Sequence, residues 1–386
     1  MLIIELNEFD PVFLKENAKE LNLKNILYFF NLNHSETYTN EKKEHQGLDP
    51  WVQWVSIHTG KPFSQHKVKR LGQTSSQKEE QIWERIFKVS SLKWGVWGAM
   101  NAPLGDKEGI GFFLPDPWSF EEKAYPDSLN NFLSFPKYMS KNYLSTNKIQ
   151  LIISGFKTLS FMLANSGRGI KRKIFSKLFK AFYLSGINVH SLNTILDYIN
   201  CLYFIEFKEK YKTQFSIIFL NHIAHLQHHF WNKDQEISNQ MKFGLFICDE
   251  ILGELKNNIC SKESIILLNG LKQKNVSKKG FFVYRQKEPI NFIKIICPIA
   301  CQVQQNMTND ATLIFKNSRD TLTAQKFLKE IKLKYKKCNL LFVERIEENK
   351  LFIQIEIEEK IGKNEKIILR RNIINFYDHI ELVTER

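Results

Sequence analysis

QFSIIFLNHIAHLQHHFW, residues 214–231, is the stretch that decides the fold. Its first half is a short run of β-branched and aromatic residues, which predicts a strand buried on both faces. Such strands usually belong to parallel sheets covered by helices. In open α/β sheets, ligands bind beyond the carboxyl ends of the strands. We therefore expect a site at Asn221 and the histidines that follow it.

Length and composition predict a globular chain. With 386 residues and 43% hydrophobic content, the sequence suits a large α/β domain with an insertion or a smaller partner domain. The formal charge of +14 favours anionic partners. The many lysines are equally consistent with a biased nucleotide composition, because the chain is also rich in Ile, Asn and Phe.

Localisation is predicted from cysteine usage and from apolar runs. The six cysteines are scattered and form no Cys-x-x-Cys pair, which indicates reduced thiols. Acidic residues follow directly on the first apolar residues, unlike in a signal peptide. No apolar run approaches the roughly 20 residues that span a bilayer. We expect a cytoplasmic protein, in one reading peripheral to the membrane.

Further strand patterns repeat the arrangement at Asn221. Residues 2–6 precede Asn7, and residues 264–268 precede Asn269. These patterns predict an α/β fold with a mostly parallel central sheet flanked by helices, a helical insertion and a C-terminal β-α-β-β section. The expected boundaries are a first part of the core at 1–118, a basic helical insertion or cap at 119–211, a second part of the core at 212–285, and a section at 286–386 that completes the sheet or forms a subdomain.

Within the insertion, residues 156–182 alternate apolar and basic side chains at helical spacing. A basic amphipathic helix of this kind can lie on an anionic membrane surface. The alternative is a helix that packs its apolar stripe on the core and exposes its lysines to water.

The histidines after Asn221 are candidate metal ligands. His222, His225 and His229 have i, i+3, i+7 spacing and would share one face of a helix. Imidazoles are common ligands of transition metals. A metalloprotease is excluded, because Leu226 stands where the catalytic Glu of that motif must be. The alternative to metal or anion binding is a neutral hydrogen-bonded network.

Residues 49–66 carry further candidates. Asp49 and Pro50 suit the N-cap and first position of a helix, whose free N–H groups can bind an anion. Core packing is the other explanation for Trp51 and Trp54 on that helix. Lys61 ends a Thr-Gly-Lys run, but the upstream glycine of a phosphate-binding loop is missing.

The order of these motifs resembles the alkaline phosphatase superfamily, particularly its phosphodiesterase and nucleotide-pyrophosphatase-like branch. Asn221-His222-Ile223-Ala224-His225 matches the spacing of that family's Asp-x-x-Gly-His motif. His66 matches a histidine shortly after a Thr-Gly element, and Asn269-Gly270 stands where Asp-His would be. The resemblance covers roughly residues 1–275 and implies a phosphate- or sulfate-ester ligand at the strand ends.

The departures from that family change the expected chemistry. Asn7, Asn221 and Asn269 would replace three metal-binding aspartates, and Gly270 would replace a histidine. Two divalent cations about 4 Å apart repel by on the order of 17 kcal/mol at an effective dielectric near 20, and neutral amides cannot offset this. The resemblance therefore implies at most one divalent metal, zinc or manganese.

The functional hypotheses follow from these residues. The leading one is an ester hydrolase or group transferase that acts on an anionic small molecule or glycan ester. Its candidate catalytic residues are Asp49, Ser56 and His66; its candidate metal ligands are His222, His225 and His229; its candidate ligand-binding residues are Asn7, Asn221, Asn269 and Lys61. The alternative is a non-catalytic binding or scaffold protein, associated with a membrane or polysaccharide machinery. Nucleic-acid binding has no support beyond net charge.

Overall fold

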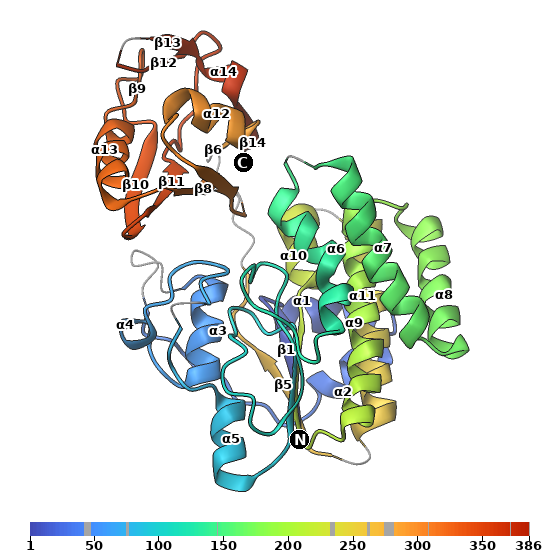
Figure 1. Cartoon of the computed structure of the whole chain (residues 1–386). Helices are drawn as coiled ribbons and strands as arrows, with labels where there is room; N and C mark the ends of the chain where they lie inside the picture. The colour runs from blue at the N-terminus through green and yellow to red at the C-terminus, as the bar shows by residue number, and fades with distance from the viewer. Residues whose placement is uncertain are drawn as a thin grey trace. The chain divides into compact units, whose positions relative to one another are not determined.

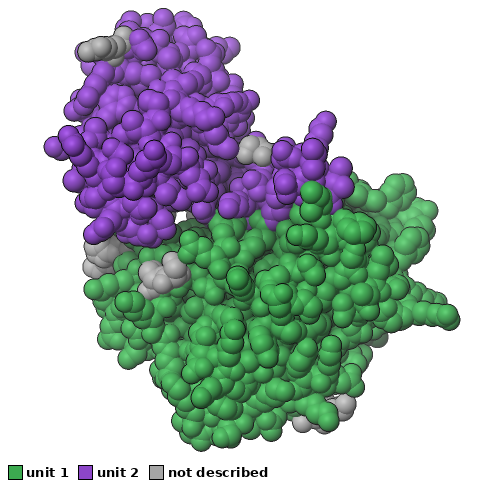
Figure 2. All heavy atoms as spheres, viewed as in Figure 1, with its two compact units in different colours: residues 1–137, 153–275 green, residues 138–152, 276–386 purple. Residues whose placement is uncertain are grey.

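A computed structural model describes most of the chain. The described residues are 1–41, 48–74, 77–144, 146–231, 236–260, 263–273, 282–307, 309–370 and 372–385. The chain divides into two compact units, coloured separately in Figure 2. Unit 1 comprises residues 1–137 and 153–275, and unit 2 comprises residues 138–152 and 276–386.

Unit 1 is built on a five-stranded sheet with the order β3-β2-β4-β1-β5. Its strands are β1 (Leu2–Leu6), β2 (Trp94–Trp97), β3 (Ile110–Leu114), β4 (Phe215–Leu220) and β5 (Ile265–Asn269). Every neighbouring pair is parallel. The predicted α/β class with a parallel central sheet is confirmed. All six residues of β4 are buried, as its continuous apolar run predicted.

Helices cover both faces of this sheet (Figure 1). The helices between residues 11 and 260 are α1 (Pro11–Glu20), α2 (Lys24–Phe30), α3 (Pro50–Thr59), α4 (Phe63–His66), α5 (Ile82–Ser90), α6 (Leu129–Asn142), α7 (Lys148–Asn165), α8 (Arg168–Leu184), α9 (Val189–Tyr211), α10 (His222–Phe230) and α11 (Asn239–Leu255), followed by a π-helical turn (Lys256–Cys260). Leu2, Ile4 and Leu6 of β1 point into the core shared with α1, α2, α9 and α11. The alternate residues of β1 face α3 and α5.

Helix α9 determines how the predicted insertion relates to the sheet. Residues 119–211 contain α6 to α9. Tyr203 and Phe204 of α9 are fully buried in the same core as β1, so α9 belongs to the layer that covers the sheet. The helix begins after Asn188, whose side-chain oxygen accepts hydrogen bonds from the backbone N–H groups of His190 and Ser191, both at 3.0 Å. This cap fixes His190 in the first turn.

Unit 2 contains mainly short strands around a separate core. Its elements are β6 (Phe282–Gln286), α12 (Pro289–Ile296), β7 (Gln302–Gln305), β8 (Asp310–Ile314), α13 (Ser318–Lys329), β9 (Lys332–Leu333), β10 (Leu341–Glu347), β11 (Lys350–Ile355), β12 (Lys366–Ile368), β13 (Ile373–Asn375), α14 (Phe376–His379) and β14 (Ile380–Glu385). These strands form sheets in the orders β10-β11-β8-β7, β13-β12-β9 and β14-β6. In the part of the chain that the structure describes, none of them joins the central sheet.

The close pairing of β2 with β3 gives a test of the fold. A Cβ atom at Gly95 would lie 2.4 Å from the ring of Phe112, which is fully buried. We expect Gly95→Ala to lower the free energy of unfolding by about 1–3 kcal/mol, because the ring has no space to move. Gly169→Ala is the control, since no atom lies within 4 Å of the added Cβ. Equal stability of both variants in urea denaturation would contradict the packing of β2 on β3.

Candidate functional site

Three of the predicted asparagines lie at the carboxyl ends of neighbouring strands. Asn7 follows β1, Asn221 follows β4 on one side of it, and Asn269 ends β5 on the other. The Asn7 side-chain amide donates a hydrogen bond to Asn221 Oδ1 at 2.7 Å. Asn269 instead donates to the backbone oxygen of Phe9 at 2.6 Å. The structure therefore joins two of the three amides and ties the third to the chain after β1.

Trp54 of α3 completes the contacts of the Asn7 amide. Its indole Nε1 donates to Asn7 Oδ1 at 2.8 Å, and the Trp54 side chain is fully buried. A Cβ atom at Gly270 would lie only 2.6 Å from the Trp54 ring. The indole thus fills the space beside position 270, where the resemblance places a metal-binding histidine. Asn7 has its donor and its acceptor occupied by protein atoms.

The same face of α3 carries a second buried contact to β1. His58 lies one helical turn after Trp54, and its Nε2 is 2.8 Å from Glu5 Oε1. Both side chains are only 1% exposed, so this pair is shielded from water. Trp54 and His58 are four residues apart and lie on one face of α3. Trp54 contacts Asn7, just after β1, and His58 contacts Glu5 within β1. The pair anchors α3 on the sheet, and neither residue was among the predicted site residues.

Ser56 and His66, two of the proposed catalytic residues, do lie together. Ser56 Oγ is 3.0 Å from His66 Nε2, while His66 Nδ1 accepts a hydrogen bond from the backbone N–H of Val68 at 3.0 Å. A neutral imidazole that accepts at Nδ1 carries its hydrogen on Nε2, so His66 donates to Ser56. Burial lowers the pKa of His66, which favours this neutral form, although Glu41 and Glu79 oppose the shift. In this tautomer, His66 cannot take a proton from Ser56.

The remaining candidates of this region lie at opposite ends of α3. Asp49 is the N-cap residue, and Lys61 follows Gly60, which ends the helix in the left-handed conformation. The ten-residue helix separates Asp49 from Lys61 by about 15 Å at 1.5 Å per residue. The structure thus brings Ser56 and His66 together and keeps Asp49 apart from Lys61.

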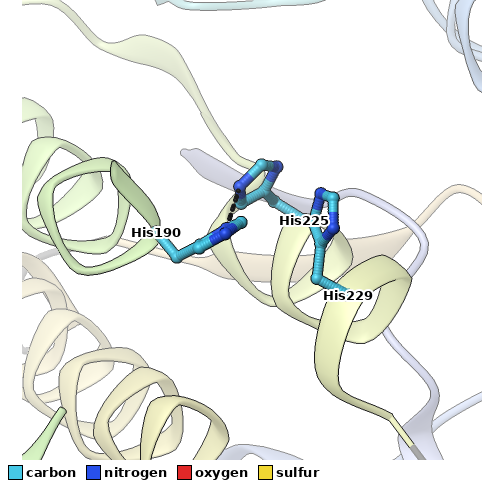
Figure 3. Close-up of side chains that lie close together, drawn as sticks. All are labelled: His190, His225 and His229. Atoms are coloured by element: carbon cyan, nitrogen blue, oxygen red, sulfur yellow. Dashed lines mark hydrogen bonds between the residues drawn. The ribbon is translucent and has the colours of Figure 1, made fainter. Parts of the chain in front are cut away.

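Three histidines converge where α9 meets α10. They are His190 in the first turn of α9 and His225 and His229 one turn apart on α10, as Figure 3 shows. His190 Nδ1 is 2.9 Å from His225 Nε2, and one candidate ligand atom from each of the three residues lies within 4.8 Å of the others. His190 and His225 are half-buried, whereas His229 is exposed. The cluster is therefore held by two helices and is open to solvent on one side.

The predicted set of metal ligands contained His222 in place of His190. His222 is instead buried, with its Nδ1 2.8 Å from Asp197 Oδ2. The same carboxylate oxygen accepts the backbone N–H groups of Asn221 at 2.7 Å and of His222 at 2.8 Å. Because His222 is the first residue of α10, its side chain turns back to this capping carboxylate. The i, i+3, i+7 spacing therefore does not place His222 in the cluster.

His190 was missed because it lies 35 residues before His225 and has no local motif. Helical spacing is the sequence feature that could have indicated His190. His190 and Asp197 are seven residues apart on α9 and therefore lie on the same side of that helix. On α10, His222 faces Asp197, while His225 and His229 face His190. The contact between the two helices thus carries one capping pair and one histidine cluster.

Two imidazoles of the cluster, those of His190 and His225, resist protonation. Burial, followed by the neighbouring His229, His190 and His228, lowers the pKa of His225 to about 4, against a smaller opposing effect of Asp197. Burial also lowers the pKa of His190. Neutral imidazole is the form that binds a metal, so these two ligands are available at neutral pH. The arrangement can hold a transition-metal ion.

Asp197 offers a test of this geometry. We expect Asp197→Ala to lower the free energy of unfolding by about 1–3 kcal/mol, because two backbone N–H groups and His222 lose their acceptor. Asp10→Ala is a matched control, since Asp10 caps α1 through a single bond to the Phe13 N–H at 2.8 Å. We expect a cost of about 1 kcal/mol or less for the control. A smaller loss for Asp197→Ala than for Asp10→Ala, measured by urea denaturation, would contradict the capping role.

The lowered pKa of His225 predicts a pH dependence. Between pH 6.5 and about 4 the unfolded chain binds a proton at His225 that the folded protein excludes. The free energy of unfolding therefore falls as the pH decreases through this window, and the full contribution is present above pH 6.5. We expect wild type to lose more stability between pH 7 and pH 5 than His225→Gln in urea denaturation. The exposed His34 gives the control His34→Gln, which should behave as wild type. Identical losses for all three proteins would be inconsistent with a neutral, half-buried His225.

Comparison with known proteins adds no relative to this description. Neither a protein-family model, nor a curated protein, nor a solved structure matched the chain.

Proposed function

We propose that the protein binds one divalent transition metal, zinc first of all, through His190, His225 and His229, and that it acts there on a phosphate or sulfate ester. The observation that carries this proposal is the convergence of three imidazoles from two helices beyond the carboxyl end of β4. Ligand sites in parallel α/β sheets lie at this end of the strands. The convergence is open to solvent at His229, where a substrate can approach.

The ligand set favours zinc. Imidazole nitrogens suit zinc, whereas manganese and magnesium prefer carboxylates and water. In a tetrahedral site with bonds of about 2.0 Å, ligand nitrogens lie about 3.3 Å apart. His190 Nδ1 and His225 Nε2 are 2.9 Å apart, and one candidate ligand atom from each of the three residues lies within 4.8 Å of the others. Three histidines leave a fourth position for water, whose pKa bound zinc lowers to about 7.

The charge of the site favours an anionic substrate. The three ligands are neutral and so would leave the full double charge of the metal uncompensated. A phosphate or sulfate ester supplies opposite charge at that point. The formal net charge of +14 acts in the same direction at longer range. His225 and His190 would position the metal, and the exposed His229 would border the substrate.

A two-metal phosphatase mechanism is not part of this proposal. At the strand ends, Asn7 is occupied by Trp54 and Asn221, and the Trp54 ring closes the space beside Gly270. The same observation favours a second candidate, a binding protein of this fold that holds a metal or an anion without turnover. Metal binding with no hydrolysis would select this second candidate.

Metal content tests the proposal. We expect protein purified without chelator, or reloaded with zinc, to hold one zinc per chain by elemental analysis. His225→Ala should reduce zinc affinity at least tenfold, and His190→Ala should do the same, because each removes one of three ligands. Zinc-dependent hydrolysis of bis-p-nitrophenyl phosphate or p-nitrophenyl sulfate should disappear in these variants.

His228→Ala is the matched control for the metal experiment. His228 is adjacent to His229 on α10, but its Nε2 lies 3.0 Å from the side-chain nitrogen of Gln273, outside the cluster. We expect this variant to retain zinc. Loss of zinc from His228→Ala but not from His190→Ala would show that the ligands are misassigned.

A further inference from the structure

Helices α7 and α8 expose large apolar side chains in regular stripes. On α7 these are Ile153, Phe156, Leu159 and Leu163, and on α8 they are Phe175, Phe179, Phe182 and Tyr183. The exposed fractions run from 42% for Ile153 to 70% for Phe156 and Phe175. Their spacing of three or four residues places each set on one side of its helix. We call these eight residues the α7–α8 surface.

The α7–α8 surface is separate from the buried faces by which the two helices pack on unit 1. Phe161 of α7 is buried against Phe132 and Tyr203, with ring centroids 5.5 and 5.8 Å apart. On α8, Ala181 is buried, and Ile174 and Leu178 pack against the main core. Figure 1 shows α8 on the outer side of α9 and α11, away from the sheet. Exposed apolar area of this extent on a water-exposed face indicates an interaction site.

The charge of the surrounding segment is one-sided. Residues 128–196 contain no Asp or Glu and ten Lys or Arg. Three of these lysines are paired with α11: Lys173 with Glu254, and Lys177 and Lys180 with Glu250. Four further cations are exposed and form no ion pair with any residue that the structure describes: Lys157, Arg168, Lys171 and Arg172. The α7–α8 surface is thus flanked by free positive charge alone.

We propose that the α7–α8 surface docks on an anionic lipid bilayer, with its aromatic side chains at the headgroup level and the four free cations on lipid phosphates. The 18 residues of α7 are about 27 Å long, which suits a helix lying in the membrane plane. Each Lys or Arg near an anionic membrane contributes about 1 kcal/mol. Among the described residues, no helix has the length and apolar character needed to cross a bilayer. The protein would therefore bind the membrane peripherally.

Vesicle flotation tests this docking. We expect the full chain to float with vesicles of phosphatidylcholine containing 30% phosphatidylglycerol, and not with phosphatidylcholine alone. Binding should decrease severalfold as salt is raised from 50 to 500 mM, because exposed charges are screened over about 8 Å at 0.15 M. The charge variant Arg168→Glu/Lys171→Glu/Arg172→Glu and the apolar variant Phe175→Ser/Phe179→Ser/Phe182→Ser should each lose at least tenfold in binding.

Matched controls keep the result specific to this surface. Lys19→Glu/Lys24→Glu/Lys78→Glu makes the same change in net charge at exposed positions elsewhere in unit 1. Tyr38→Ser/Val89→Ser removes exposed apolar side chains, 88% and 83% exposed, from other elements. Both controls should bind vesicles as wild type does, and all variants should keep the wild-type circular dichroism spectrum. Equal binding to neutral and anionic vesicles overturns the proposal, and so does a loss of binding in the control variants as large as in the surface variants. Self-association of the protein without vesicles, abolished by the apolar variant, also overturns it.

Discussion

A single carboxylate oxygen holds together the two helices on which the candidate site depends. Asp197 Oδ2 accepts the backbone N–H groups of Asn221 and His222 and lies 2.8 Å from His222 Nδ1. It therefore caps the first turn of α10 and fixes α10 against α9. Removal of this carboxylate would leave those donors without partners. Two turns earlier on the same side of α9, His190 meets His225 and His229.

The two polar regions of unit 1 differ in how their contacts are completed. At the ends of β1 and β4, Asn7, Asn221 and Trp54 satisfy one another, and the indole closes the space beside Gly270. The histidine cluster instead places three imidazoles together, with His190 Nδ1 2.9 Å from His225 Nε2. Protonation there is opposed by burial and by mutual repulsion. One nitrogen from each of the three imidazoles could bind the same metal ion, which is why we place the chemistry at the cluster and not at the amides.

Much of the fold was predictable, because it depends on local patterns. Continuous apolar runs predicted the strands now seen as β1, β4 and β5. In the structure these strands are neighbours, and Asn7, Asn221 and Asn269 lie at their carboxyl ends. His225 and His229 were predicted from spacing on one helix. His190 and Asp197 were not, since their contacts cross 24 to 35 residues and depend on how α9 packs on α10. Glu5 and His58 were missed for the same reason: an acid inside a buried strand is explained only by a partner on another element.

The central claim is that His190, His225 and His229 share one metal ion. Zinc K-edge X-ray absorption of the zinc-loaded full chain tests it most directly, because the fine structure reports the type and distance of the ligand atoms. The account predicts three imidazole nitrogens at about 2.0 Å with one further light atom. A sulfur shell at about 2.3 Å, or a spectrum without the outer-shell signal of imidazole, would contradict it.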